Sequence, residues 1–320
     1  MAKEPASERR RADTLIAQGR PAEAVPILRE LVQSAPEEES LLLTLAWALH
    51  DSGRKEEAAD CFERLLDREL SRGIFTGFAY DELVRLYREE MRWEKLLSVC
   101  ERAVAAQPED AGLLRTLGES YLAAEKSDAA AAVFEKLTVL ETDVPGHWCG
   151  LGNARIAAGD PSGAEAAYLR AAELDPEDAP ALFCRLADGC LRKGYPEQAR
   201  PALLRCLALC PDEPLYRMAL GDVLICLGKP DAAAETYAHA VALNPAAAGA
   251  CWNRLGNGLA KAEQPLMAVE AFQKAVAAEP KNPRYLLRLA AAYAAAGLAD
   301  ASLAALRRME APCNSQGRCP

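Results

Sequence analysis

Cysteine and histidine are the residue types of this chain best suited to metal or thiol chemistry, and the sequence holds 11 of the first and three of the second. Cys206 and Cys210 lie four residues apart, a spacing that places two side chains on one face of a helix. Two thiolates could ligate a metal ion, but no Cys-x-x-Cys pair or Cys-His cluster supplies further ligands. The histidines are widely separated: His50, His147 and His239. We therefore expect two small packing residues here, with no metal site and no cofactor.

Sequence motifs of enzymes are missing from the chain. Gly150 and Gly152, and again Gly256 and Gly258, are spaced as in a dinucleotide-binding loop, but no strand-forming segment precedes either pair. The sequence contains no phosphate-binding P-loop, no His-Glu-x-x-His and no Gly-x-Ser-x-Gly. We therefore expect a protein that is not an enzyme.

Arginine and asparagine side chains towards the C-terminal end have the chemistry to bind an anion. The cluster consists of Asn253, Arg254, Asn257, Arg284 and Arg288. Arg254 and Arg288 are 34 residues apart, and Arg284 lies one helical turn before Arg288. Guanidinium groups can bind a carboxylate through two parallel hydrogen bonds, with amide donors alongside. The alternative interpretation is ordinary salt bridges on a solvated face, such as one between Asp222 and Arg254.

The stretch from Trp252 to Pro280 predicts the elements that would position this cluster. Apolar positions of a first helix recur at i, i+3 and i+7 and are Trp252, Leu255 and Leu259. A second stripe follows a short break and consists of Ala268, Phe272 and Ala275. Gly256 is small where the second helix must approach closely, and Pro280 ends that helix because it lacks an N–H. The stretch therefore predicts an antiparallel pair of helices.

This pattern of large and small residues recurs along nearly the whole chain. Matching positions elsewhere are Trp148, Leu151, Gly152, Tyr168, Gly221 and Tyr237. Nine units follow one another, at 5–38, 39–72, 77–110, 111–144, 145–178, 180–213, 214–247, 249–282 and 283–316. The pattern resembles the tetratricopeptide repeat, W-x2-L-G-x2-Y…A-x3-F…P with a period of about 34 residues. The resemblance implies an all-α protein, a right-handed superhelical solenoid of about nine helix-turn-helix units.

The resemblance also divides the chain into four parts. Residues 1–72 hold two N-terminal units, residues 73–76 form an insertion, residues 77–316 hold units three to nine, and residues 317–320 are a tail. The insertion either bends the solenoid or lengthens a helix. Near the C-terminus, Cys313 and Cys319 either close a small ring on oxidation or belong to a disordered tail, which is the favoured interpretation.

In this family, the first helix of each unit lines a concave groove that holds an extended peptide or a partner helix. Beside the arginine and asparagine cluster, the resemblance assigns to this groove Cys149, Asn153, Cys184, Arg185 and Met218. Cys149, Cys184 and Met218 would give the groove an apolar floor, or alternatively seal neighbouring units against each other. Some chaperone-binding members grip a C-terminal carboxylate with a set of five side chains. Arg284 and Arg288 match the last two of that set, and the first three are replaced here.

Charge and hydropathy restrict the partners and the location. A net charge of −10 and a pI near 5.1 argue against general binding to nucleic acid or to anionic membranes. The first residues are basic but lack the apolar segment of a signal peptide. No window approaches the roughly 18 apolar residues of a membrane-spanning helix. We therefore expect a cytoplasmic protein that neither binds nucleic acid nor inserts into a membrane.

These observations predict a non-enzymatic adaptor or scaffold that holds a segment of a partner protein in its groove. An accessory subunit that organises an enzyme or secretion assembly through its ends is the alternative, and a thiol- or metal-responsive protein is a weaker one. The last unit leaves an apolar helix face on residues 299–310, which could bind a partner or a second copy of the chain, or be covered by the tail.

Overall fold

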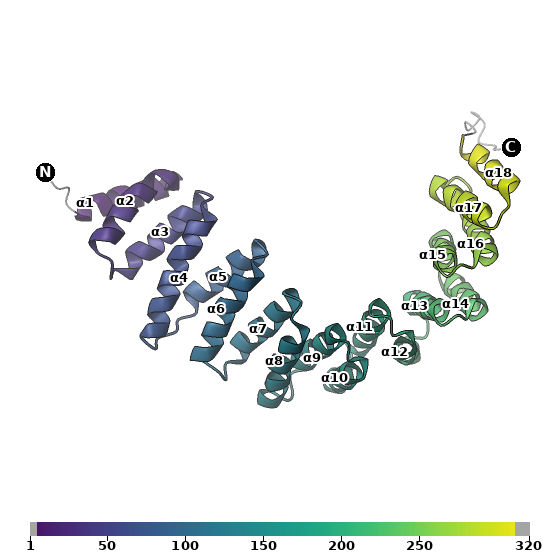
Figure 1. The fold of residues 1–320 in the computed structure, drawn as a ribbon, viewed down its shortest axis with the longest axis horizontal. Helices are drawn as coiled ribbons and strands as arrows, with labels where there is room; N and C mark the ends of the chain where they lie inside the picture. The colour runs from purple at the N-terminus through teal and green to yellow at the C-terminus, as the bar shows by residue number, and fades with distance from the viewer. Residues whose placement is uncertain (1–4, 311–320) are drawn as a thin grey trace. The chain divides into compact units, whose positions relative to one another are not determined.

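The computed structural model describes residues 5–310, which form 18 α-helices and one short 3₁₀ helix, with no β-strand in that range (Figure 1). The all-α architecture predicted from the sequence is confirmed. The helices are α1 (Pro5–Ala17), α2 (Pro21–Ser34), α3 (Glu39–Asp51), α4 (Lys55–Ser71), α5 (Phe78–Glu89), α6 (Trp93–Ala106), α7 (Ala111–Ala123), α8 (Ser127–Leu140), α9 (Pro145–Ala158), α10 (Pro161–Leu174), α11 (Ala179–Arg192), α12 (Pro196–Leu209), α13 (Pro214–Cys226), α14 (Pro230–Leu243), η1 (Pro245–Ala247), α15 (Ala248–Lys261), α16 (Pro265–Ala278), α17 (Pro283–Ala295) and α18 (Ala299–Glu310).

Consecutive helices pack as hairpins, and residues 5–310 contain nine of these pairs. The turn inside a hairpin needs a residue in the left-handed region, which glycine adopts without steric cost. Gly159, between α9 and α10, has a φ of 87°. Met91 fills the corresponding turn between α5 and α6 with a φ of 53°. Glu125 and Glu263 take the same place in the fourth and eighth hairpins, so three of the nine turns use a residue that is strained there, and the other six use glycine.

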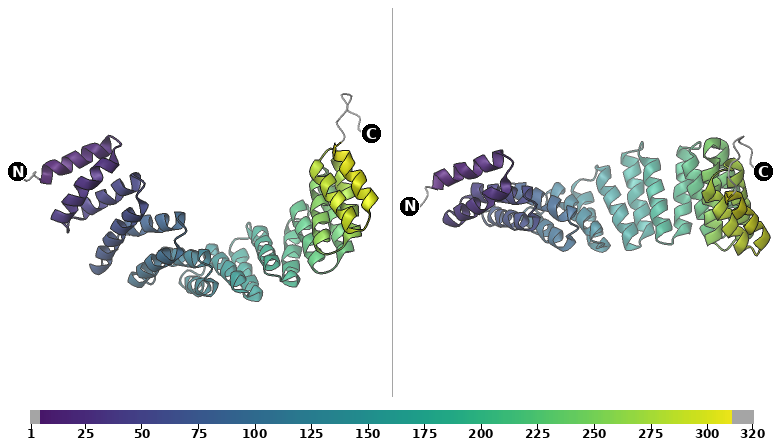
Figure 2. Two further views of the ribbon diagram at one scale, coloured as in Figure 1. Left: turned by 45° about the horizontal axis from the view of Figure 1, so that its top comes forward. Right: turned by 90° about the horizontal axis from the view of Figure 1, so that it is seen from above.

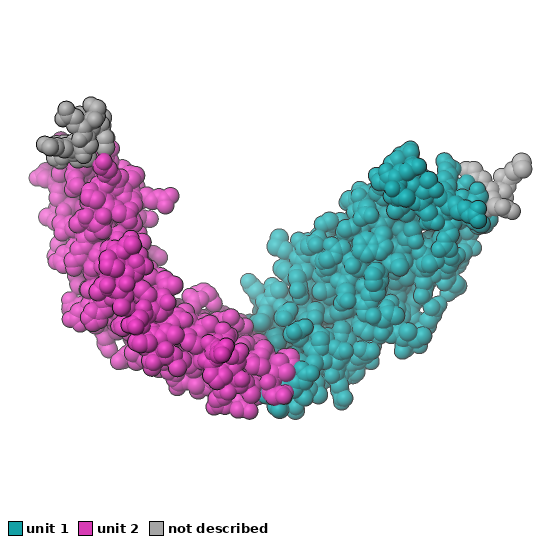
Figure 3. All heavy atoms as spheres, turned by 180° about the vertical axis from the view of Figure 1, so that it is seen from behind, with its two compact units in different colours: residues 1–142 teal, residues 143–320 magenta. Residues whose placement is uncertain are grey.

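The N-terminal compact group, residues 1–142, contains α1–α8 as four hairpins (Figure 3). Its core is apolar and includes the fully buried side chains of Leu42, Phe62, Leu83 and Tyr87. Helix α4 is 17 residues long, whereas its neighbours α3 and α5 have 13 and 12. The extra turn of α4 and a short loop therefore separate the second hairpin from the third.

The C-terminal compact group, residues 143–320, contains α9–α18 as five hairpins. Within this group the first helices, α13, α15 and α17, lie along one side and the second helices, α14, α16 and α18, along the other (Figures 1 and 2). Helix α9 also contacts α11, and α13 contacts α15. The first helices of successive hairpins therefore form a shared surface.

Inside each regular hairpin, a glycine of the first helix lies against an aromatic ring of the second. A Cβ atom added to Gly256 would lie 2.7 Å from the ring of Phe272, and one added to Gly221 would lie 2.5 Å from the ring of Tyr237. Gly152 and Tyr168 repeat this contact at 2.8 Å. The ring occupies the space that a side chain would fill, so these positions accept only glycine without a shift of the neighbouring helix.

Candidate partner-binding groove

Two adjoining hollows lie on the side of the C-terminal group that α13, α15 and α17 form. The larger, of about 720 Å³, is lined by α15 and α17 and includes Asn253, Asn257, Arg284, Leu287 and Arg288. The smaller, of about 560 Å³, is lined by α13 and α15 and includes Asp222, Ile225, Arg254, Asn257 and Lys261. Asn257 lines both hollows. The five residues of the arginine and asparagine cluster predicted from the sequence therefore all face this groove, which we call the C-terminal groove.

Arg284 and Arg288 supply the positive charge of the larger hollow. They lie one turn apart on α17, and both side chains are exposed. Within residues 5–310 neither forms an ion pair. The N-terminus of α17 lies beside them, where Asn282 Oδ1 accepts a hydrogen bond from the backbone N–H of Arg284 at 3.1 Å. Helix N-termini favour anions, so two guanidinium groups and a helix dipole act in the same direction here.

Asn253 also lines the larger hollow, but its amide oxygen is covered by the protein. Its Oδ1 atom is buried and has no hydrogen-bond partner. A buried polar atom without a partner costs about 1–3 kcal/mol.

Arg254 is held by a carboxylate of the protein itself. Its Nε and Nη2 atoms lie 2.9 Å and 2.5 Å from Asp222 Oδ2, and the hydroxyl of Tyr237 donates to Asp222 Oδ1 at 2.5 Å. Burial lowers the pKa of Arg254, but Asp222 and Tyr237 outweigh this effect and raise it. Burial raises the pKa of Tyr237, and Asp222 raises it further. Of the two interpretations of Arg254 from sequence, the salt bridge with Asp222 is present.

The other groove residues assigned from sequence lie outside the two hollows. Asn153 on α9 accepts a hydrogen bond from the Tyr168 hydroxyl at 2.6 Å, which joins the two helices of one hairpin. Arg185 is exposed on α11. Cys149 and Cys184 are half-buried. Met218 packs against the core, with its sulfur 3.2 Å from the sulfur of Cys251 on α15, so this contact seals two neighbouring hairpins.

The repeat positions identified from sequence form the interior of the hairpins. Buried side chains and glycines among them are Leu151, Gly152, Tyr168, Gly221, Tyr237, Gly256 and Phe272. Trp148 and Trp252 are half-buried at the edge of the core. The Nζ atom of Lys274 lies 4.7 Å from the centre of the Trp252 ring, so the exposed face of this indole is covered by a cation.

Most cysteines of the described residues are buried or half-buried, whereas Cys226 is exposed. Cys206 is buried and donates to Pro180 O at 3.3 Å, and burial raises its pKa to about 12. Cys210 caps the end of α12. Within residues 5–310 no group of three or more His, Cys, Asp or Glu side chains is arranged to hold a metal ion. Cys313, Cys319 and the predicted tail lie outside the described residues.

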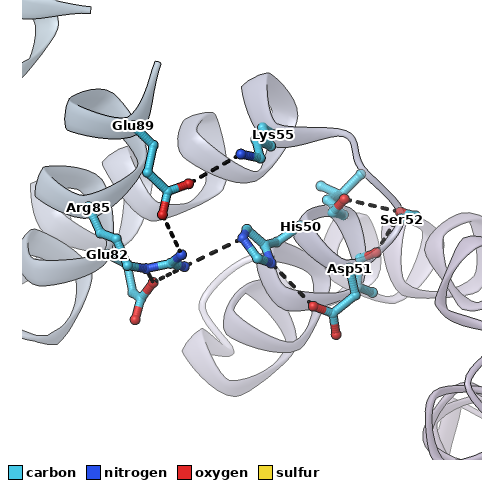
Figure 4. A network of polar contacts seen from close by, with 9 residues as sticks. His50, Asp51, Ser52, Lys55, Glu82, Arg85 and Glu89 are labelled. Carbon is cyan, nitrogen blue, oxygen red and sulfur yellow. Dashed lines mark hydrogen bonds and ion pairs between the residues drawn. The ribbon is translucent and has the colours of Figure 1, made fainter. Parts of the chain in front are cut away.

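A polar network around His50 in the N-terminal group was missed by the sequence reasoning (Figure 4). His50 Nδ1 lies 3.2 Å from Asp51 Oδ1, and His50 Nε2 lies 3.4 Å from Nη2 of Arg85 on α5. An arginine can only donate, so Nε2 accepts and Nδ1 carries the proton. Arg85 also donates to Glu82 at 2.7 Å and to Glu89 at 3.3 Å. The network therefore ties α3 to α5.

Ser52 lies next to this network, which brings serine, histidine and aspartate together. The Ser52 hydroxyl donates to Ala48 O at 2.6 Å, inside the last turn of α3 (Figure 4). Nucleophilic catalysis needs the serine proton directed at the imidazole instead. The geometry is that of a helix C-terminus and not of a catalytic triad.

Aromatic side chains flank the same network. The ring centre of Trp47 lies 5.7 Å from that of His50, 5.8 Å from Phe62 and 6.4 Å from Phe78. Phe78 is 42% exposed. The signal available in the sequence was the spacing of Leu43, Trp47 and His50 at i, i+4 and i+7 on a first helix.

Among the helices of residues 5–310, none has the length and apolar character that a membrane span requires.

The sequence matches family models described as tetratricopeptide repeat. One model covers residues 15–71, and another covers residues 79–146, 149–214, 184–248 and 253–316. No curated protein matches the chain.

The chain is also similar to several solved structures. The crystal structure of MamA is 22% identical, with a TM-score of 0.39, over 51% of this chain and 88% of MamA. YrrB, described as a TPR protein with an unusual peptide-binding site, is 21% identical, with a TM-score of 0.38, over 58% of this chain and 95% of YrrB. A tetratricopeptide repeat protein from Parabacteroides merdae is 12% identical, with a TM-score of 0.42, over 89% of this chain and 97% of that protein.

Proposed function

Because the chain belongs to the tetratricopeptide repeat family, we propose that it is a non-enzymatic adaptor that holds an extended segment of a partner protein in the C-terminal groove. The segment carries at least one carboxylate, from an aspartate, a glutamate or a chain end. Repeat solenoids present such extended surfaces because each unit contacts only its neighbours.

Arg284 and Arg288 carry this proposal. Two exposed guanidinium groups without a counter-ion within residues 5–310 leave a local excess of positive charge on a chain whose net charge is −10. A carboxylate can form two parallel hydrogen bonds with either guanidinium. Leu287, which is 53% exposed in the same hollow, offers contact to an apolar side chain.

A single residue explains why Arg288 is available and Arg254 is not. Asp222 directly follows the packing glycine Gly221, and it neutralises Arg254 on the next first helix. Asn257 directly follows the packing glycine Gly256 and so takes the same place one hairpin later. Arg288 consequently has an uncharged amide where Arg254 has a carboxylate.

The test compares partners captured from a lysate of the native host by the full-length chain and by two double charge reversals. Arg284→Glu/Arg288→Glu alters the groove. Arg307→Glu/Arg308→Glu is the matched control, because it makes the same charge change on exposed residues of α18. A partner lost only with the groove variant supports the proposal, and a partner retained by both variants contradicts it.

A second variant refines this test at the level of the isolated segment. Once the captured partner is mapped to a peptide, calorimetric titration should show weaker binding to Asn257→Asp, which keeps both arginines but places a carboxylate near Arg288. Loss of one ion pair at a partly exposed site corresponds to about 0.2–1 kcal/mol. Equal affinity of the parent protein and Asn257→Asp would show that Asn257 does not influence binding at Arg288.

A second candidate function, contact through the end of the stack, is favoured by apolar side chains on α18. Leu303 is 53% exposed and Met309 is 38% exposed. This candidate requires that the control variant on α18, and not the groove variant, loses the partner. Self-association by the same face would appear as a larger mass in light scattering that Leu303→Asp abolishes.

A further inference from the structure

Trp47 and Phe78 form an aromatic surface in the N-terminal group that the C-terminal groove does not explain. The two rings come from the first helices α3 and α5 and are tilted at 59° to each other. The buried ring of Phe62 packs edge-to-face against Trp47, at an interplanar angle of 83°. The indole is therefore fixed in orientation while part of its surface stays accessible. We call Trp47, Phe78, Asp81 and Glu82 the Trp47 surface.

The charges around the Trp47 surface are unbalanced towards negative. Four carboxylates lie on or beside it, and they belong to Asp51, Asp81, Glu82 and Glu89. Two cations form ion pairs with these carboxylates: Arg85 contacts Glu82 and Glu89, and Lys55 contacts Glu89 at 3.2 Å (Figure 4). His50 lies between Asp51 and Arg85. The next cation along α5, Arg88, is directed to Glu119 of α7 at 3.8 Å.

Asp81 is a carboxylate of this surface without a neighbouring cation among residues 5–310. It lies three residues after Phe78 on α5, so its side chain shares a face with that ring. It forms no ion pair within residues 5–310. Partial burial raises the pKa of Asp81, and the neighbouring carboxylate of Glu82 raises it further. A positive charge placed beside Asp81 would offset both effects.

Two other aromatic rings of the chain have a lysine ammonium group over them. Lys274 lies over the Trp252 ring at 4.7 Å, and Lys95 lies over the Tyr87 ring at 5.5 Å. The Trp47 ring has no cation of the chain over it within the described residues; its ring contacts are with His50, Phe62 and Phe78. Tryptophan is the aromatic side chain that attracts cations most strongly.

We propose that the Trp47 surface is a second recognition site, which binds an arginine or lysine side chain of a partner segment between the aromatic rings and the carboxylate of Asp81. The cation takes the place over the ring that lysines of the chain take elsewhere, and Asp81 supplies its counter-charge. The site is independent of the C-terminal groove, which selects the opposite charge.

Nuclear magnetic resonance of the full-length chain tests this directly. The protein has four tryptophans, and the indole N–H signal of Trp47 is assigned by its loss in Trp47→Phe. Three short capped Gly-Ser peptides are titrated, which carry arginines, glutamates or leucines at the same positions. We expect the arginine peptide to shift the Trp47 signal, and the glutamate and leucine peptides to leave it in place. The signal of Trp252, which Lys274 covers, serves as an internal control and should not move.

Substitutions separate this site from the proposed function of the groove. Asp81→Asn should weaken binding of the arginine peptide about two- to fivefold, as expected for loss of one exposed ion pair. Asp128→Asn makes the same charge change on an exposed residue of α8 and should have no effect, and the same holds for Arg284→Glu/Arg288→Glu. Circular dichroism confirms that each variant is folded.

Three outcomes would overturn the proposal. The first is an arginine peptide that leaves the Trp47 signal unmoved. The second is a leucine or glutamate peptide that shifts it equally, which would indicate an apolar or an anion-binding surface. The third is an Asp81→Asn variant that binds the arginine peptide as tightly as the parent protein.

Discussion

Replacing Gly256 by alanine tests the contact on which the hairpin packing depends. The added Cβ atom would lie 2.7 Å from the Phe272 ring, whereas ordinary contacts begin near 3.4 Å, so the ring must move by about 0.7 Å, from 2.7 Å to 3.4 Å. Phe272 is 2% exposed, so the ring cannot move into solvent without disturbing its neighbours. Overpacking of this kind costs about 1–3 kcal/mol.

Helix propensity acts in the opposite direction and needs a matched control. Alanine is favoured over glycine inside a helix by about 0.5–1 kcal/mol. Gly146 is the second residue of α9, with nothing within 4 Å of an added Cβ, so Gly146→Ala adds the same methyl group without overpacking. Gly256→Ala should therefore be less stable than Gly146→Ala by about 1–3 kcal/mol, the overpacking cost.

Urea unfolding followed by far-ultraviolet circular dichroism measures this difference, with native-state hydrogen exchange on α15 and α16 as the local readout. In a Phe272→Leu background, Gly256→Ala should cost much less stability than in the parent protein, because the clashing ring is then absent. A Gly256→Ala protein as stable as Gly146→Ala would refute the close contact between the two helices.

Two further predictions concern single ionisable groups. Cys226 is exposed, whereas burial raises the pKa of Cys206 to about 12, so iodoacetamide should modify Cys226 before Cys206 in the native protein; equal rates by peptide mass mapping would contradict the packing of Cys206. Burial, together with Glu82, raises the pKa of Asp81, and only the ionised form attracts a cation. Affinity for the arginine peptide should therefore fall on acidification at a pH above the pKa of about 3.9 of an ordinary aspartate, and Asp81→Asn should lack this fall.

The hairpins could be predicted from the sequence because the contacts that define them are local. Gly256 and Phe272 are 16 residues apart, and their pairing follows from helix length, a tight turn and the recurrence of both residue types. The reason for the glycine could not be predicted in the same detail. The sequence indicates a small residue, but only the coordinates show that an aromatic ring, and not a helix backbone, fills the space above it.

Side chains of the groove were harder to predict, because their neighbours come from different hairpins. Whether Arg254 binds a ligand or Asp222 depends on how far successive first helices are rotated, and no repeat pattern states this. The Trp47 surface was missed for a related reason. Phe78 begins the hairpin that follows the 73–76 insertion, where the register is interrupted, so its approach to Trp47 on the preceding hairpin has no counterpart among the other hairpins of residues 5–310.

The groove also shows how a repeat protein can acquire a binding site without changing its packing. Gly221 and Gly256 both lie against an aromatic ring of the second helix, which is Tyr237 in one hairpin and Phe272 in the next. The residue after each glycine lines the C-terminal groove, and it is an aspartate in α13 and an asparagine in α15. The aspartate neutralises the arginine of the next hairpin, whereas the asparagine leaves Arg288 without a carboxylate at the equivalent place. The choice between aspartate and asparagine at this place thus decides whether an arginine on this scaffold holds two helices together or remains available for a ligand.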